Sequence, residues 1–116
     1  LAACRPIASI FSEGTKRYPS SFDFAVFAYC RTGNHIDARM FAPDDDTPED
    51  PATGSASAAL TALLSECAGT PLALKISQGE DMGRPSQIKT EALEGDPMPI
   101  RVTGSAVLMM EGHIVV

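Results

Sequence analysis

The stretch SASAALTALLSECA, residues 55–68, decides the fold of this chain. Only one of its fourteen residues is charged, Glu66, and the others are Ala, Leu, Ser, Thr and Cys around the whole circumference of a helix. Gly69 follows as a typical helix-ending residue, with Pro71 just beyond it. A surface helix carries a polar stripe, whereas a helix that is apolar or small all round is buried on every side. The stretch therefore predicts a central helix enclosed by other elements.

The segments around this helix are expected to be short strands. Alternating, β-branched and aromatic residues, separated by glycine turns, predict strands at 22–31, 36–41, 72–77, 87–93 and 100–103, and a closing hairpin that pairs 105–110 with 113–116. Residues 1–13 have helical spacing, with Gly14 as the expected end and Pro6 as an alternative start. These patterns together predict one α+β domain over residues 1–116, in which a mixed, barrel-like sheet wraps around one buried helix.

Composition and charge exclude several classes of protein. Apolar residues make up 44% and charged residues 21% of the 116-residue chain, a balance typical of a soluble globular domain. No apolar stretch approaches the ~18 residues that span a bilayer, and no cationic leader is present. The net charge of -6 and the lack of any basic run disfavour nucleic-acid binding. The chain begins at Leu1 and not at methionine, which suggests a fragment, a processed product or missing upstream residues.

The cysteines have no spacing suited to a disulfide framework or to zinc. Cys4, Cys30 and Cys67 are odd in number, far apart and set among apolar neighbours. We therefore expect them to be small buried residues of a protein in a reducing cytoplasm.

The entrance of the central helix, EDPATGSA at residues 49–56, combines several features of an active site. The N-terminus of a helix offers unpaired N–H groups and the positive end of the dipole, which favour an anion. Gly54 lacks the Cβ that would block a ligand, and the hydroxyls of Thr53 and Ser55 can cap the helix or bind the same ligand. Pro51 restricts Asp50 to an extended conformation and so directs its carboxylate. A plain helix cap beside a solvated aspartate is the alternative interpretation.

Three blocks of the sequence resemble the PhzF (phenazine biosynthesis-like) family in order and spacing. They are RMFAP (39–43) with residues 49–56, then QG (78–79) with MGRPS (82–86), and finally VTGSAV (102–107) with EG (111–112). The resemblance implies a diaminopimelate epimerase-like fold of two lobes, each with a sheet around a central helix, of which this chain is the C-terminal lobe. The implied reaction is a proton-shift isomerisation of a small carboxylate-bearing substrate, without metal or organic cofactor.

The same resemblance assigns roles within the helix entrance. It implies Asp50 and Ser55 as catalytic residues, and Thr53, Gly54 and Ser55 as the substrate-carboxylate cradle. It places the principal acid–base glutamate and a catalytic histidine in an N-terminal lobe that this chain lacks, so the chain alone is expected to be inactive. Amino-acid racemases of related fold carry a cysteine before this helix, whereas Asp50 and Pro51 stand here, which disfavours two-cysteine racemisation.

Several residues and one alternative function remain open. We expect His35 in a turn and His113 in the closing strand to be structural or solvated. We expect structural roles for two arginines as well, with Arg39 paired with the acidic loop and Arg84 at the beginning of a strand after a glycine turn. The competing function is a non-catalytic binding or dimerisation module of the same fold. A cytoplasmic location is expected, and a homodimer is a further expectation.

Overall fold

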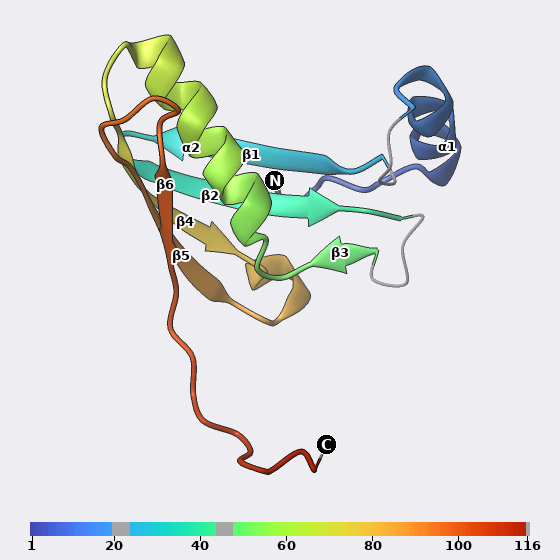
Figure 1. The fold of residues 1–116 in the computed structure, drawn as a ribbon. Helices are drawn as coiled ribbons and strands as arrows, with labels where there is room; N and C mark the ends of the chain where they lie inside the picture. Colours follow the sequence, from blue (N-terminus) through green and yellow to red (C-terminus); the bar gives the residue numbers. More distant parts are fainter. Residues whose placement is uncertain (20–23, 44–47, 116) are drawn as a thin grey trace.

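The computed structural model describes residues 1–19, 24–43 and 48–115. In chain order, the elements of this part of the chain are α1 (Ala8–Arg17), β1 (Val26–Thr32), β2 (His35–Phe41), β3 (Glu49–Asp50), α2 (Gly54–Ala68), β4 (Ala73–Gln78), a short 3-10 helix (Glu80–Met82), β5 (Ser86–Ala92) and β6 (Ile100–Thr103). The predicted central helix and five of the predicted strands are thus present, with shifts of a few residues at their ends. Residues 22–23, where the first of these strands was predicted to begin, lie outside the described residues. Figure 1 shows α2 lying along one face of the sheet.

The sheet is mixed but open. Its strand order is β1-β2-β4-β5-β6, and β3 adds to one end of β2. The β2–β4 pair is parallel and the other pairs are antiparallel. A parallel pair needs a crossover connection, and α2 lies within the crossover from β2 to β4. Since β1 and β6 do not pair with each other, the barrel-like closure predicted from the sequence is wrong for this chain, whereas the mixed α+β class is confirmed.

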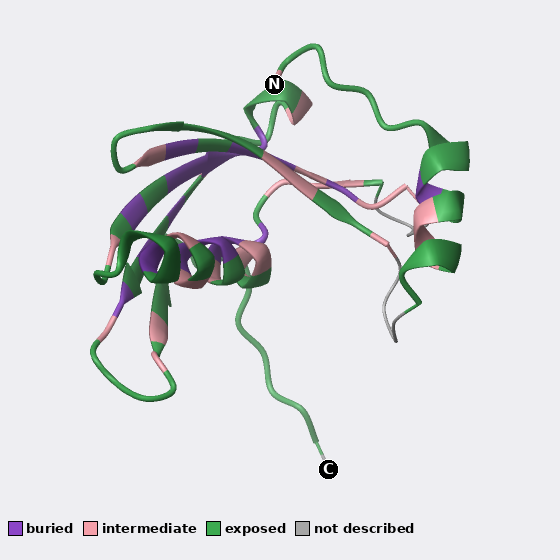
Figure 2. Cartoon of the chain, turned by 90° about the horizontal axis from the view of Figure 1, so that it is seen from above, coloured by how far each residue is buried: buried purple, intermediate pink, exposed green. Residues whose placement is uncertain are grey.

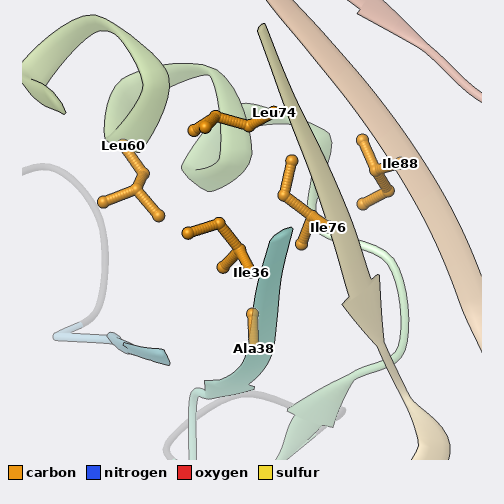
Figure 3. Packing of buried hydrophobic residues seen from close by; sticks show 6 residues of the cluster. All are labelled: Ile36, Ala38, Leu60, Leu74, Ile76 and Ile88. Atoms are coloured by element: carbon orange, nitrogen blue, oxygen red, sulfur yellow. The ribbon is translucent and has the colours of Figure 1, made fainter. Parts of the chain in front are cut away.

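One hydrophobic core joins α2 to the sheet. The cluster consists of Ile36, Ala38, Leu60, Leu74, Ile76 and Ile88 (Figure 3). Ile36 and Ile76 are completely buried, and each such side chain contributes about 1.5–3 kcal/mol through removal of apolar surface from water. Beside the cluster, the hydroxyls of Thr61 on α2 and Thr90 on β5 form a buried hydrogen bond of 2.6 Å. The small polar residues of α2 therefore serve close packing against the sheet.

Helix α2 is buried on one face only, which corrects the prediction that it is enclosed on all sides. Its buried residues are Ser57, Leu60, Thr61 and Ser65. The opposite face is exposed, and Leu63 on that face keeps 55% of its surface accessible. Figure 2 shows the buried residues of α2 on the side that meets the sheet. One face of α2 is exposed because the open sheet covers only one side of the helix, whereas a closed barrel would cover all sides.

The predicted closing hairpin at the C-terminus does not form. Residues 104–115 contain no strand, and their large apolar side chains, Val107 to Met110, Ile114 and Val115, are 79–96% exposed. Figure 1 shows this segment leaving the sheet after β6. Val116 lies outside the described residues. A two-stranded hairpin is marginally stable unless a third strand or a helix supports it, and alternation in the sequence supplies no such support.

The N-terminal helix also differs from its prediction. Helix α1 begins two residues after Pro6 and continues through Gly14 to Arg17, so the expected end at Gly14 is wrong. Phe11, the buried residue of α1, meets Phe24 edge to face with ring centroids 5.8 Å apart. A Cβ on Gly14 would lie 2.6 Å from the Phe24 ring. Gly14 therefore stands in the helix to admit an aromatic ring, and not to end the helix.

Two further properties complete the fold. Cys4, Cys30 and Cys67 are exposed free thiols, so the prediction that they are buried is wrong. None of the helices in the described ranges is both long enough and apolar enough to cross a membrane.

Candidate active site

Asp50 lies where β3 meets the entrance of α2. It pairs with Met40 of β2, and this strand pairing gives it the extended backbone expected before Pro51. Its Oδ1 accepts a hydrogen bond of 3.1 Å from the Ala52 N–H, and its Oδ2 accepts one of 2.7 Å from the Thr53 hydroxyl. A carboxylate oxygen accepts more than one hydrogen bond, so the group is oriented and still able to accept from a ligand.

Gln78 at the end of β4 ties this loop to the sheet. It is 1% exposed, and its Oε1 accepts a hydrogen bond of 3.1 Å from the Thr53 N–H. Its Nε2 donates to the Asp50 carbonyl at 2.7 Å and to the Thr53 hydroxyl oxygen at 2.9 Å. Gln78 is not among the site residues predicted from the sequence. One feature of the sequence could have identified it: Gln78 lies on the same face of the strand as the apolar Leu74 and Ile76, so its polar side chain is directed toward the core.

Replacing Gln78 with leucine is expected to lower the free energy of unfolding by roughly 3 kcal/mol. The change leaves the Thr53 N–H and the Asp50 carbonyl without their amide partner, and each unpaired buried polar group costs about 1–3 kcal/mol. Denaturant unfolding monitored by circular dichroism measures the loss. The matched control is Gln87→Leu on β5, because Gln87 is exposed and makes one side-chain hydrogen bond, to Ser77. Equal stability of the two variants would contradict the bridging role of Gln78.

The first turn of α2 leaves its backbone donors available. Thr53 is the N-cap residue and makes no side-chain hydrogen bond to the helix, because its hydroxyl donates to Asp50. Of the two roles left open for the Thr53 hydroxyl, capping the helix or binding a ligand, the structure therefore does not show the first. Gly54 and Ser55 follow as the first helical residues, whose N–H groups have no partner within a helix, and the Ser55 side chain is exposed. The dipole adds positive potential at this point, so the entrance of α2 suits an anion.

Packing within the protein requires glycine at position 79 but not at position 54. A Cβ on Gly54 would meet Val102 at 3.6 Å, an ordinary contact, so packing within the protein does not require glycine there. Gly79 has a φ of +81°, and a Cβ there would collide with the Arg84 carbonyl and lie 2.9 Å from the Pro51 carbonyl. The hydroxyl of Ser86 donates to the same Pro51 carbonyl at 2.7 Å. The link between β4 and β5 thus holds the loop that carries Asp50.

A mostly buried ion pair anchors β3 on the other side of Asp50. Arg39 donates two parallel hydrogen bonds of 2.8 Å to the carboxylate oxygens of Glu49, as expected for an arginine paired with the acidic loop. The side chains are 8% and 18% exposed. Arg39 also donates to the carbonyls of Leu1 and Cys4, and it lies 3.6 Å from Asp81. Hydrogen bonding to Glu49, with the charge of Glu49, raises the pKa of Arg39, so the guanidinium remains charged.

The remaining candidate residues lie apart from this group. His35 is the first residue of β2 and not a turn residue, and its Nε2 contacts Asp37 at 3.1 Å and Ser77 at 3.3 Å. His113 is exposed in the C-terminal segment that forms no strand. Arg84 lies two residues before β5, so the prediction that it begins this strand is wrong. Within the residues described, no group of three or more His, Cys, Asp or Glu side chains is placed to hold a metal ion.

Comparison with known proteins agrees with the motifs read from the sequence. The family model described as phenazine biosynthesis-like protein matches residues 19–112, and the chain therefore belongs to that family. The chain is 41% identical to an uncharacterized isomerase of Mesorhizobium japonicum, over 76% of this chain and 32% of that protein. It is 33% identical to the trans-2,3-dihydro-3-hydroxyanthranilate isomerase of Pseudomonas aeruginosa, over 78% of this chain and 34% of that protein.

The match covers only part of each relative. An uncharacterized isomerase of Deinococcus radiodurans is 40% identical over 76% of the chain, but only 31% of that relative is covered. The chain therefore spans about a third of the length of the curated relatives that it matches.

Proposed function

We propose that this chain supplies one half of the active site of an isomerase that shifts a proton within a small, carboxylate-bearing substrate. The observation that carries the proposal is the carboxylate of Asp50, held by two hydrogen bonds beside the uncapped N-terminus of α2. Such an entrance binds a substrate carboxylate through backbone N–H groups and places an oriented carboxylate next to it. The proposal agrees with the names of the relatives, which are isomerases.

The roles of the site residues follow from their positions. The N–H groups of Gly54 and Ser55 bind the substrate carboxylate, with the Ser55 hydroxyl available as a further donor. Asp50 accepts or holds the migrating proton, and Thr53 and Gln78 keep its carboxylate in place. In this proposal the acid–base glutamate and the histidine come from an N-terminal lobe of the complete protein. The fold of that protein is diaminopimelate epimerase-like, and no metal or organic cofactor takes part.

Turnover of trans-2,3-dihydro-3-hydroxyanthranilate, the substrate in the name of the Pseudomonas relative, tests the proposal. The complete protein is expected to isomerise this compound, or a close cyclic analogue, in an assay followed by proton NMR. The 116-residue chain alone is expected to show no turnover, because the proposal assigns the second acid–base group to the N-terminal lobe. Equal turnover by the chain alone would contradict a site divided between two lobes.

The second candidate function is a non-catalytic binding or dimerisation module. The exposed apolar side chains of Leu63 and of the segment 107–115 favour it. The same assay separates the two functions when it is combined with light scattering. A complete protein that dimerises through this domain and isomerises none of these compounds would favour the module.

A further inference from the structure

A large hollow of the structure lies away from the entrance of α2. It has a volume of about 850 Å³ and lies across one end of the sheet, from the start of β2 through β4 and β5 to β6. Its charged lining residues are His35, Lys75, Lys89, Glu91 and Arg101. Concave sites for small ligands commonly measure about 300–1,000 Å³, so the hollow has the size of a ligand site.

The strand register places these side chains on the face of the sheet away from α2. Leu74 and Thr90 are buried toward α2, and successive residues of a strand point to opposite faces. Lys75 and Lys89 therefore point to the outer face. They are paired directly across β4 and β5, and His35 of β2 pairs with Lys75 on its other side. Figure 2 shows α2 packed against the other face of the sheet, the inner face.

The charge of the hollow contrasts with that of the chain. The chain has 15 acidic and 9 basic residues, yet three of the basic residues and one acidic residue line this hollow. Arg101 forms an ion pair of 2.7 Å with Glu91, whereas within the described residues Lys75 and Lys89 form none. Like charges directly opposite each other destabilise a sheet, so this pair of lysines costs stability unless an anion lies between them.

We propose that the hollow binds a small polyanion, phosphate- or carboxylate-bearing, between Lys75 and Lys89. Each ammonium group is a strong donor to phosphate or carboxylate oxygens, and Arg101 adds a third positive charge at the rim. Thr32, Asn34 and Thr103 in the lining offer further donors. This site is separate from the proposed active site, which lies at the other end of β4, near Gln78, and on the other face of the sheet.

Calorimetric titration of the full-length protein at low ionic strength tests the proposal, with inorganic pyrophosphate and citrate as probes. Binding of pyrophosphate alone identifies phosphate as the preferred group, binding of citrate alone identifies carboxylate, and binding of both identifies charge as the determinant. Lys75→Gln and Lys89→Gln are each expected to weaken binding about three- to tenfold, since each removes one close charge. The matched control is Lys16→Gln on α1, an exposed lysine outside the hollow, which is expected to leave the affinity unchanged.

A charge reversal separates loss of binding from loss of structure. Lys89→Glu places an acid opposite Lys75, so this variant is expected to abolish binding while its melting temperature stays equal or rises. The proposal is overturned if neither probe binds. It is also overturned if the Lys75 and Lys89 variants bind as tightly as the unmodified protein, or if Lys16→Gln weakens binding to the same extent.

Discussion

Replacing Asp50 with asparagine in the complete protein is expected to lower kcat by at least about a hundredfold, with little change in melting temperature. A positioned acid or base contributes about 10²–10⁴-fold to proton transfer, and asparagine cannot exchange a proton at neutral pH. The stability is expected to persist because an amide has the same shape as the carboxylate. Its oxygen can accept from the Ala52 N–H, and its NH₂ can donate to the Thr53 hydroxyl oxygen.

Steady-state kinetics and thermal unfolding of the same samples measure both effects. Asp37→Asn is the matched control, because Asp37 is an exposed carboxylate on β2 that contacts His35, and its replacement is expected to leave kcat unchanged. Ser55→Ala tests the cradle separately, and it is expected to reduce turnover without loss of stability because Ser55 is exposed. If Asp50→Asn and Ser55→Ala both kept the full rate, the entrance of α2 would not be the active site.

Replacing Arg39 with methionine is expected to lower the free energy of unfolding by about 3–5 kcal/mol. The change leaves the mostly buried Glu49 carboxylate without its partner, and breaking such a pair from one side costs this much. It also removes donors from the carbonyls of Leu1 and Cys4. Denaturant unfolding measures the loss.

Two further variants identify the cause of that loss. The double variant Arg39→Met with Glu49→Leu is expected to recover much of the stability, because the mostly buried Glu49 charge is then removed together with its partner, and the remaining Asp81 carboxylate is 37% exposed. Arg101→Met removes an exposed pair, with side chains 58% and 48% accessible, and is expected to cost less than about 1 kcal/mol. An effect of Arg39→Met no larger than that of Arg101→Met would show that the Arg39–Glu49 pair is not a principal anchor of β3.

Local sequence patterns predicted the elements of this fold because local properties determine them. The run of small and apolar residues predicted a helix at 55–68, and α2 spans Gly54–Ala68. Alternation predicted β4 and β5 to within one residue at either end. The closure of the sheet depends on which distant strands pair. Alternation does not determine this choice, so the predicted barrel was wrong. The predicted hairpin after Gly104 was wrong because alternation also does not show whether another element supports a hairpin.

The part of the candidate site that is local in the sequence could be predicted, and the part that depends on distant residues could not. Asp50, Thr53, Gly54 and Ser55 are adjacent in the sequence, so one motif identified them together. Gln78 contacts two of them from 25 and 28 positions away, and no spacing rule connects residues at such a separation. The motif also suggested Thr53 as a helix cap, whereas the nearby Asp50 carboxylate is a stronger acceptor for its hydroxyl.

The parallel pairing of β2 with β4 has a consequence for the order of folding. The hairpins β1–β2 and β4–β5 join neighbours in the chain, so each closes a short loop. The pairing of β2 with β4 connects the two hairpins. It closes a longer loop, because β3 and α2 lie between these strands in the chain, so we expect it to form later. Because Asp50 lies within this late segment, we expect the proposed catalytic group to be positioned in the last step of folding, so that a partly folded chain does not contain the candidate site.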